Sequence, residues 1–422
     1  MKIKIEKIVY PGKSLARIDG KVVFTDQGLP DETVEIAITK ETTGYSEAKT
    51  TEILSPSPHR VESRCGHYQA CSAYQCIDYP KQVEIKKEQI LDLLTRQLKL
   101  SGLKLHFRES SKIWSYRNKV TLKLIHDNGI TSFAYNLPGE IYKFIPLDEC
   151  FLLPNTTNLF LKDFIKTIPG KLLLPISQVR VKENSKKQLL ISLYHNSSLE
   201  APDLSSSLKG LSLRFDIAGI TLINQSENIK AIVWGKDFFE EKIEDRTFYI
   251  GDESFFQVNV DMLSILVKDL KDNLDLNTNK SLADLYCGVG TFGILLASKL
   301  KSVIGVESGP ENFFFLEKNI KLNNIENFNV RMCDCEDTIR SLLRQTIDIV
   351  IVDPPRKGMD SKICNTLVKA PVPELVYISC NPATLMRDLK ILLGAYNINN
   401  IYAYDFFPHT PHIETMIFLT KK

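Results

Sequence analysis

The chain has 422 residues, too many for one ordinary domain, so we expect two or three domains. Hydrophobic residues make up 43% and charged residues 25%, as in globular proteins with real cores, and a net charge of +2 does not by itself indicate a nucleic-acid partner. The N-terminus has no apolar signal region and no apolar run reaches membrane-spanning length. We therefore expect a cytoplasmic protein without membrane contact, acting as a monomer.

Short apolar runs alternate with glycine and proline turns over residues 1–55. The runs at 21–24 and 33–38 each follow a polar or glycine turn. Strands at this spacing predict a small antiparallel β-barrel. The pattern from Gly12 to Glu32 resembles a TRAM domain, an OB-like RNA-binding barrel. A generic barrel without a ligand is the alternative.

Three of the nine cysteines lie close together, directly after a proline–serine linker at 55–58. They are Cys65, Cys71 and Cys76. Disulfides are not expected in a cytoplasmic chain. A cysteine cluster of this density predicts a metal or iron–sulfur site.

The segment 81–123 is strongly basic. It carries eleven Lys or Arg against four acids, a local charge of +7 (11 − 4), with Phe107, Trp114 and Tyr116 interleaved. Basic and aromatic side chains together are typical of surfaces that contact phosphates and stack on bases, and a solvated charged face is the alternative. Helical periodicity at 81–100 and mixed strands beyond residue 112 predict a mixed α+β central domain over 56–245.

From residue 246 the pattern changes to short apolar runs that alternate with helices. The runs at 282–286, 303–306, 347–352 and 375–378 are nearly all apolar. Such runs are typical of buried parallel strands in an α/β sheet. Residues 246–422 are therefore predicted to form a Rossmann-like domain.

A glycine-rich turn follows the first of these strands. Gly288, Gly290 and Gly293 come directly after Asp284, and glycine lets a backbone turn tightly against a ligand. Glu307 ends the next strand, 23 residues after Asp284 (307 − 284), where a carboxylate can bind two ribose hydroxyls. This pattern indicates a nucleotide cofactor, and a dinucleotide or a purely structural turn remains an alternative.

Three loops after later strands carry reactive side chains. Asp353 begins D-P-P-R-K-G, Cys380 lies in S-C-N-P, and Glu414 ends F-P-H-T-P-H-I-E. A nucleophilic cysteine and a carboxylate beside a nucleotide cofactor are the groups that covalent chemistry on an unreactive ring carbon needs. A cysteine packed as a small hydrophobe and a glutamate in a turn are the alternatives.

The order and spacing of these motifs resemble the RNA uracil-5-methyltransferase family. The glycine turn matches D-x-x-C-G-x-G, and residues 254–259 match the family segment S-F-F-Q-x-N. The resemblance implies a Rossmann-like fold, an RNA substrate with a flipped-out base, Cys380 as nucleophile and Glu414 as base. It also implies that S-adenosyl-L-methionine binds at Gln257, Tyr286, Gly288, Gly290, Thr291, Glu307, Asp334 and Asp353.

The cysteine cluster departs from the family pattern. Cluster-bearing members carry C-x5-C-x2-C and a distant fourth cysteine; here Cys65 and Cys71 keep the first spacing, but Tyr74 stands at the third position. Cys76 follows two residues later, and Cys150 matches the distant fourth. The resemblance implies a [4Fe–4S] cluster on these four cysteines. Zinc on the same residues and loss of the metal are the alternatives.

The sequence defines the RNA substrate less closely than it defines the reaction. A TRAM-like barrel with a cysteine cluster resembles the 23S ribosomal RNA branch of the family. The alternatives are a tRNA uracil-5-methyltransferase, an RNA cytosine-5-methyltransferase and a non-catalytic RNA-binding protein of ribosome assembly. The loop 353–356 lacks the cysteine that cytosine enzymes use, which favours uracil.

Overall fold

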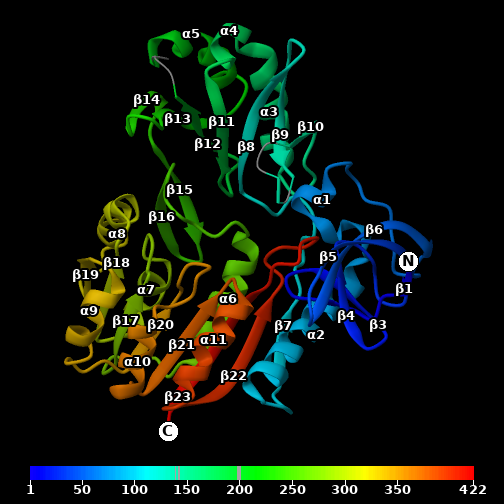
Figure 1. Ribbon diagram of the computed structural model, residues 1–422. Coiled ribbons are helices and arrows are strands. Elements are labelled where there is room, and N and C mark those ends of the chain that lie inside the picture. The colour runs from blue at the N-terminus through cyan, green and yellow to red at the C-terminus, as the bar shows by residue number, and fades with distance from the viewer. Residues whose placement is uncertain (138, 141–142, 197–200) are drawn as a thin grey trace.

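The computed structural model describes the chain except residues 138, 141–142 and 197–200. Figure 1 shows three lobes: the N-terminal barrel in blue at the right, a central lobe mainly in green at the top, and a C-terminal lobe from green to red at the lower left. Within the described residues, no helix is long and apolar enough to cross a membrane.

The N-terminal lobe is the predicted small barrel. Its six-stranded sheet has the order β1-β5-β6-β4-β3-β2, antiparallel except for the parallel pair β4–β6. Alternate residues such as Ile3, Val23 and Val34 fill its core, because successive side chains of a strand point to opposite faces. The strands are β1 (Lys2–Lys4), β2 (Lys7–Val9), β3 (Lys13–Ile18), β4 (Lys21–Thr25), β5 (Thr33–Glu41) and β6 (Tyr45–Ser55).

The segment after the barrel leads into the C-terminal lobe. The short helices α1 (Tyr68–Cys71) and η1 (Ala73–Cys76) precede the long helix α2 (Tyr79–Leu98), which Asp78 caps by accepting from the Lys81 N–H. The strand β7 (Leu105–Arg108) then pairs with β22 of the C-terminal sheet. Thus α2 and β7, which the sequence predicted as central-domain elements, belong to the layers of the C-terminal lobe.

The central lobe is a seven-stranded sheet with helices on one face. Its order is β10-β9-β8-β11-β12-β13-β14, and its core includes Val120, Leu122 and Val181 from the sheet and Phe160 and Phe164 from a covering helix. The elements are β8 (Lys119–Asp127), β9 (Ile130–Asn136), β10 (Phe144–Leu147), α3 (Asn155–Thr167), α4 (Gly170–Leu173), β11 (Ile176–Glu183), β12 (Leu189–His195), α5 (Ala201–Ser212), β13 (Ile217–Asn224) and β14 (Ile229–Gly235).

A hairpin connects the central and C-terminal lobes. It consists of β15 (Phe238–Ile243) and β16 (Arg246–Gly251), and its apolar side chains join the core of the C-terminal lobe. The predicted boundary between residues 245 and 246 therefore falls inside this hairpin, next to its turn.

The C-terminal lobe is the predicted α/β domain. Its eight-stranded sheet has the order β19-β18-β17-β20-β21-β23-β22-β7, with one apolar core on each face. The strands are β17 (Ser281–Leu285), β18 (Ser302–Glu307), β19 (Phe328–Met332), β20 (Ile349–Val352), β21 (Glu374–Ser379), β22 (Tyr396–Tyr404) and β23 (Glu414–Lys421). The helices are α6 (Val260–Asn273), α7 (Thr291–Leu296), η2 (Ala297–Lys299), α8 (Pro310–Leu322), α9 (Cys335–Leu342), α10 (Ser361–Lys369) and α11 (Pro382–Leu392).

The direction of β23 decides where the last motif lies. β23 runs antiparallel to β21, with Thr415 opposite Ser379. The first residue of β23 therefore lies at the edge where β21 ends, which is the carboxyl edge of the parallel strands. In open α/β sheets ligands bind at this edge.

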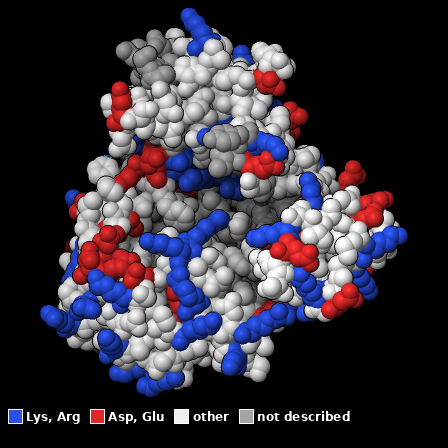
Figure 2. Space-filling view, viewed as in Figure 1, with Lys and Arg blue, Asp and Glu red and all other residues white. Residues whose placement is uncertain are grey.

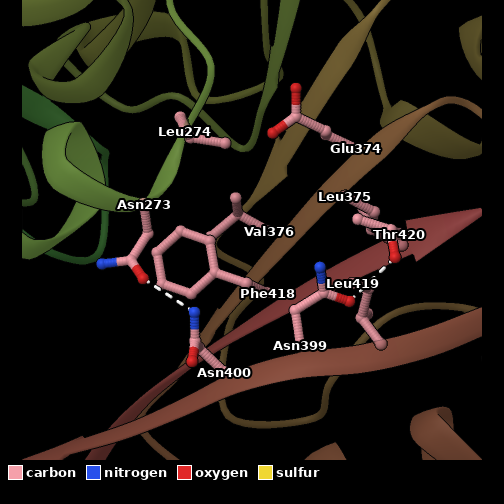
Figure 3. Close-up of a pocket in the computed structure, with 10 residues that line it drawn as sticks. All are labelled: Asn273, Leu274, Glu374, Leu375, Val376, Asn399, Asn400, Phe418, Leu419 and Thr420. Atoms are coloured by element: carbon pink, nitrogen blue, oxygen red, sulfur yellow. Dashed lines mark hydrogen bonds between the residues drawn. The ribbon is translucent and has the colours of Figure 1, made fainter.

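The opposite edge of the sheet holds a small cavity (Figure 3). It is lined by residues that include Glu374 and Thr420, which face each other at the amino end of β21. Its volume of about 40 Å³ holds water rather than a nucleoside. This cavity is thus separate from the edge that carries the predicted site.

Candidate active site

Six loops bring the predicted cofactor and catalytic residues to one edge of the C-terminal sheet. The glycine turn follows β17, Glu307 ends β18, Asp334 follows β19, and Asp353 follows β20. Cys380 follows β21 and Glu414 begins β23. The sheet order places these strand ends side by side, because β19, β18, β17, β20, β21 and β23 are consecutive neighbours.

The glycine turn leaves free space in front of its backbone. Gly288 and Gly290 have positive φ angles of 56° and 91°, a conformation that side chains disfavour. A Cβ on Gly288 would meet nothing within 4 Å, whereas one on Gly293 would lie 2.6 Å from the Phe328 ring. The first glycine thus leaves room for a ligand, and the last allows α7 to pack closely on the sheet.

Backbone amides hold the Glu307 carboxylate in place. It accepts hydrogen bonds from the N–H groups of Gly288 at 2.9 Å and Gly309 at 2.6 Å. The carboxylate is therefore fixed between the glycine turn and the start of α8, the position predicted for ribose binding.

The remaining predicted cofactor residues lie on different elements and differ in burial. Thr291 is the first residue of α7, Tyr286 is half-buried beside it, and Asp334 is exposed at the start of α9. The carbonyl of half-buried Gln257 accepts from the Asn118 side chain at 3.1 Å. This bond ties the S-F-F-Q segment to the central lobe. The cofactor roles of these residues stay predictions.

Asp284 is a buried carboxyl group below the turn. Its Oδ2 accepts from the Gly293 N–H at 2.8 Å, while Oδ1 has no hydrogen-bond partner among the described residues. Burial raises the pKa of Asp284 from 3.8 to about 7, and Asp353 and Glu307 add to this effect. The folded protein therefore favours the protonated form of this side chain.

This raised pKa predicts a pH-dependent stability. Between about pH 4 and pH 7 the Asp284 carboxyl is protonated in the folded chain and ionised in the unfolded chain. The free energy of unfolding therefore decreases as pH rises through that window. In Asp284→Asn, which cannot ionise, we expect the stability gain over the wild type to grow from pH 4 to pH 7 in urea unfolding. Asp272→Asn on the exposed end of α6 is the control. A stability difference independent of pH would contradict the prediction.

Cys380 lies among charged side chains rather than in an apolar core. It is half-buried between β21 and α11. Burial, with the nearby Glu414 and Asp353 carboxylates adding to its effect, raises the pKa of the Cys380 thiol to about 11, while Arg356 opposes them. The electrostatic influence of both carboxylates means that the predicted nucleophile and base face one region. The role of Cys380 as the nucleophile stays a prediction.

Glu414 is nearly inaccessible, with 2% of its surface exposed. Its Oε1 has no hydrogen-bond partner within the described part of the chain. Burial raises the pKa of Glu414 well above its usual value, Asp353 adds to this, and Arg356 opposes it. A carboxylate with a raised pKa is a stronger base than an exposed glutamate.

A buried ion pair holds the loop that leads to Glu414. Lys86 of α2, fully buried, donates to Asp405 at 2.6 Å and to the Phe407 carbonyl at 3.1 Å. His409 stacks on Trp114 with ring centroids 3.7 Å apart, and burial lowers the pKa of His409 to about 3. His409 is therefore a neutral structural residue.

The four predicted metal ligands do not come together. Burial raises the pKa of Cys71 to about 12, and the Cys150 and Cys65 thiols add to this, so these three lie near one another. Cys76 instead donates to the Ala73 carbonyl at 3.4 Å and lies beside Arg60. The described residues contain no group of three or more Cys, His, Asp or Glu placed to hold a metal ion. The structure therefore does not support the predicted four-cysteine cluster.

The short helix η1 explains this arrangement. It directs Tyr74, only 2% exposed, into an apolar cluster, where its hydroxyl accepts from Gln89 at 3.0 Å. Gln75 takes the place near the first cysteine and donates to the Cys65 sulfur at 3.2 Å. The residues present therefore do not fit a four-sulfur cluster.

A metal analysis tests this geometry. Since Cys76 lies apart from the other three thiols, Cys76→Ser is expected to have the same iron and zinc content as the wild type after anaerobic purification. Cys71→Ser, from the group of three, is the matched comparison. Metal that is present in the wild type and absent from Cys76→Ser would contradict the structure.

The basic segment 81–123 is mostly neutralised within the chain. Trp114 lies between His409 and the Arg64 guanidinium, 4.4 Å from its ring, and Tyr116 is buried with its hydroxyl donating to the Pro408 carbonyl. These two aromatic side chains are therefore packed within the protein, and RNA contact by the cations of the segment stays a prediction. Figure 2 shows Lys and Arg side chains around the hollow below the central lobe. Six of the eleven cations pair with acids: Lys81, Lys86, Lys87, Arg96, Arg108 and Lys112.

Comparison with known proteins decides the family. Residues 78–422 match the model of the tRNA (uracil-5-)-methyltransferase family, and residues 1–51 match that of the TRAM domain. The chain belongs to the RNA uracil-5-methyltransferase family. The predicted family, TRAM barrel and Rossmann-like fold are thereby confirmed, together with an S-adenosyl-L-methionine-dependent activity on RNA.

Similar proteins match along the whole chain. An uncharacterized RNA methyltransferase from Clostridium tetani is 31% identical over 446 residues, covering 100% of this chain and 97% of the relative. One from Bacillus cereus is 26% identical, covering 99% and 96%. The Pyrococcus abyssi tRNA (uracil-54, C5)-methyltransferase, solved with S-adenosyl-L-homocysteine, has a TM-score of 0.77 at 24% identity and covers 100% of both chains. The last likeness concerns the fold.

In the present chain, the carboxyl edge of the C-terminal sheet carries groups that fit S-adenosyl-L-methionine. The open space at Gly288, the fixed Glu307 carboxylate and the unpartnered Oδ1 of Asp284 lie around one turn. Together they offer a backbone cradle and a carboxylate at the strand ends, which is what an adenosyl group requires.

Some residues around the site were missed by sequence reasoning. Lys86 was counted among the surface cations, although its partner Asp405 lies two residues before the terminal motif. Tyr10, in the turn before β3, donates to Asn381 beside Cys380. The position of Lys86 on the apolar face of α2 could have indicated a buried ion pair. No local pattern in the sequence indicates the contact of Tyr10 with Asn381.

Proposed function

We propose that this enzyme methylates C5 of a uridine in RNA through a covalent bond from Cys380 to C6 of the base. The observation that carries the proposal is the convergence of Cys380, Glu414 and Asp353 at the carboxyl edge of the sheet, next to the glycine turn. This is the set of groups that carbon alkylation of uracil requires: a nucleophile, a base and a methyl donor.

Cys380 would start the reaction. Its sulfur bonds to C6 and the thiol proton passes to water, while the electron pair of the C5–C6 double bond moves onto C5 and the C4 carbonyl oxygen. S-adenosyl-L-methionine supplies the electrophilic methyl group that C5 then takes. Because burial and two carboxylates raise the thiol pKa to about 11, Cys380 is mostly protonated at neutral pH. Its proton passes to water as the sulfur adds to C6, which leaves Glu414 free to accept the C5 proton.

Glu414 would complete the reaction. Its unpartnered oxygen takes the proton from methylated C5, the C5–C6 double bond forms again, and the Cys380 sulfur leaves C6. The loss of one proton at C5 and the gain of one methyl group balance the exchange. Asp353, whose pKa burial raises to about 7, lies close enough to influence both residues, and Arg356 offsets part of the negative charge.

The RNA substrate would lie across the hollow below the central lobe. The TRAM barrel and the basic side chains around this hollow suit contacts to phosphates (Figure 2). A target carbon inside stacked RNA cannot reach Cys380, so the uridine is flipped out or comes from a loop. We propose 23S ribosomal RNA, on the resemblance of the barrel and the cysteine segment to that branch.

Transfer RNA is the second candidate. The Pyrococcus abyssi enzyme, which shares the fold over the whole of both chains, acts on a tRNA uridine. Mass-spectrometric mapping of 5-methyluridine in 23S RNA and tRNA, with and without the gene, separates the two. A gene-dependent 5-methyluridine in 23S RNA is the expected result, and one in tRNA alone would assign the enzyme to tRNA. No gene-dependent 5-methyluridine in either would contradict the proposal.

A further inference from the structure

The N-terminal barrel touches the catalytic loops directly. The contact is the turn between β2 and β3, whose Tyr10 hydroxyl donates to the Asn381 Oδ1 at 3.3 Å. On the same turn, a Cβ added to Gly12 would lie only 2.9 Å from the Cβ of Pro411, three residues before Glu414. One barrel turn therefore contacts both the nucleophile loop and the base loop.

An apolar cluster fixes the barrel in this position. Ile8 and Leu29 of the barrel pack with Tyr74, Ile77 and Ile85, which come from η1, the residue after it and α2. A polar contact reinforces it, because the Gln89 amide of α2 donates to the Ile8 carbonyl at 3.2 Å. The barrel is thus packed against α2, and the turn at Tyr10 is held next to the site.

Asn381 connects this turn to the nucleophile. It directly follows Cys380 and caps α11, its Oδ1 accepting from the Ala383 N–H at 3.2 Å. Its amide nitrogen donates to the Arg356 carbonyl at 2.9 Å, which links the S-C-N-P loop to the D-P-P-R loop. The Tyr10 hydroxyl adds a third partner to this side chain. The Asn381 side chain therefore joins the S-C-N-P loop to the D-P-P-R loop and to the barrel turn. It also caps α11.

Tyr10 also faces the charges of the site. Burial raises the pKa of Tyr10 to about 12; Cys380 and Glu414 raise it as well, while Arg356 opposes them. The phenol is therefore a hydrogen-bond donor at every physiological pH, and it lies within electrostatic reach of both the nucleophile and the base.

We propose that Tyr10 is a positioning residue for methyl transfer: through Asn381, the TRAM barrel holds the Cys380 loop in its reactive arrangement. The barrel would then do more than bind RNA, because it completes the catalytic site of another domain. The catalytic part of this inference rests on the proposed function.

Tyr10→Phe removes the hydroxyl and keeps the ring. We expect kcat for RNA methylation to fall about fivefold or more, with KM for RNA and the Tm unchanged, because one hydrogen bond that orients Asn381 is lost. Amide hydrogen exchange in the segment 379–384 should become faster by a similar factor. The control is Tyr45→Phe, on a half-buried tyrosine of the same barrel that packs on Phe24.

A double variant tests whether Tyr10 acts through Asn381. If it does, Tyr10→Phe with Asn381→Ala has the kcat of Asn381→Ala alone. Additive losses would overturn the proposal, as would a Tyr10→Phe enzyme with wild-type kcat and wild-type exchange at 379–384. A raised KM for RNA with unchanged kcat would also overturn it, since the hydroxyl would then bind RNA. Hydrogen exchange needs no substrate, so it decides the Tyr10–Asn381 contact even if the protein methylates none of the RNAs offered.

Discussion

Replacing Cys380 by alanine is expected to lower methylation of uridine in RNA by on the order of 10⁴-fold or more, because the proposed nucleophile that adds to C6 is removed. Binding of S-adenosyl-L-methionine should persist, since the predicted cofactor residues lie on the neighbouring strand ends. The measurement is transfer of a labelled methyl group to transcript RNA, with calorimetry for the cofactor.

Cys364→Ala is the matched control for Cys380→Ala. Cys364 is a cysteine of the same domain, fully buried on α10 in the apolar core of one face of the sheet. It should keep near-wild-type activity. If Cys380→Ala methylated RNA at a comparable rate to the wild type, covalent catalysis through this residue would be wrong.

Replacing Glu414 by glutamine is expected to stall the reaction after methyl transfer. The thiol can still add to C6 and C5 can still be methylated, but without the carboxylate the C5 proton stays and the sulfur cannot leave. Turnover should fall by roughly 10³-fold, and a covalent complex with methylated RNA should accumulate. A shifted band on a denaturing gel measures it, with the methyl label in that band.

Glu374→Gln controls for the loss of a carboxylate in the same sheet. Glu374 begins β21 at the opposite edge, where it accepts from Lys280 at 2.7 Å. Its variant should release free product and leave no shifted band. Release of methylated RNA by Glu414→Gln at the wild-type rate would exclude Glu414 as the base.

The sequence predicted the sheet and its motifs because both depend on local patterns. Buried parallel strands are short and almost wholly apolar, and the residue after each strand lies at one edge whatever the rest of the fold. Asp353 and Cys380 could thus be placed at the same edge without a structure. Glu414 could not be placed in this way, because its position depends on β23 running antiparallel to β21.

Features that depend on contacts between distant segments escaped sequence reasoning. The strand β7 is remote in sequence from β22, and four residues do not reveal which sheet edge they join. In the sequence, Cys76 lies two residues beyond Tyr74, which occupies the position of the third family cysteine. In the structure, the packing of Tyr74 into an apolar cluster sets the orientation of η1. Lys86 looked like a surface cation until Asp405 was found buried beside it. In each case tertiary packing, absent from any local pattern, decides the outcome.

The contact between the barrel and the nucleophile loop also depends on segments that are distant in the sequence. Tyr10 and Asn381 are 371 residues apart, and neither lies in a pattern that predicts the other. Their contact depends on the way Ile8 and Leu29 pack against α2 and η1. A domain that resembles an RNA-binding module therefore reaches the nucleophile loop through packing alone.

The most direct test of the covalent mechanism is to trap the enzyme on RNA that contains 5-fluorouridine, in the presence of S-adenosyl-L-methionine. Fluorine at C5 cannot leave as a proton, so the sulfur–C6 bond persists after methyl transfer. Peptide mass spectrometry of the nuclease-treated complex should then find a methylated fluorouridine adduct on Cys380. A complex linked through another residue, or active enzyme that forms no covalent complex with this RNA, would contradict the mechanism.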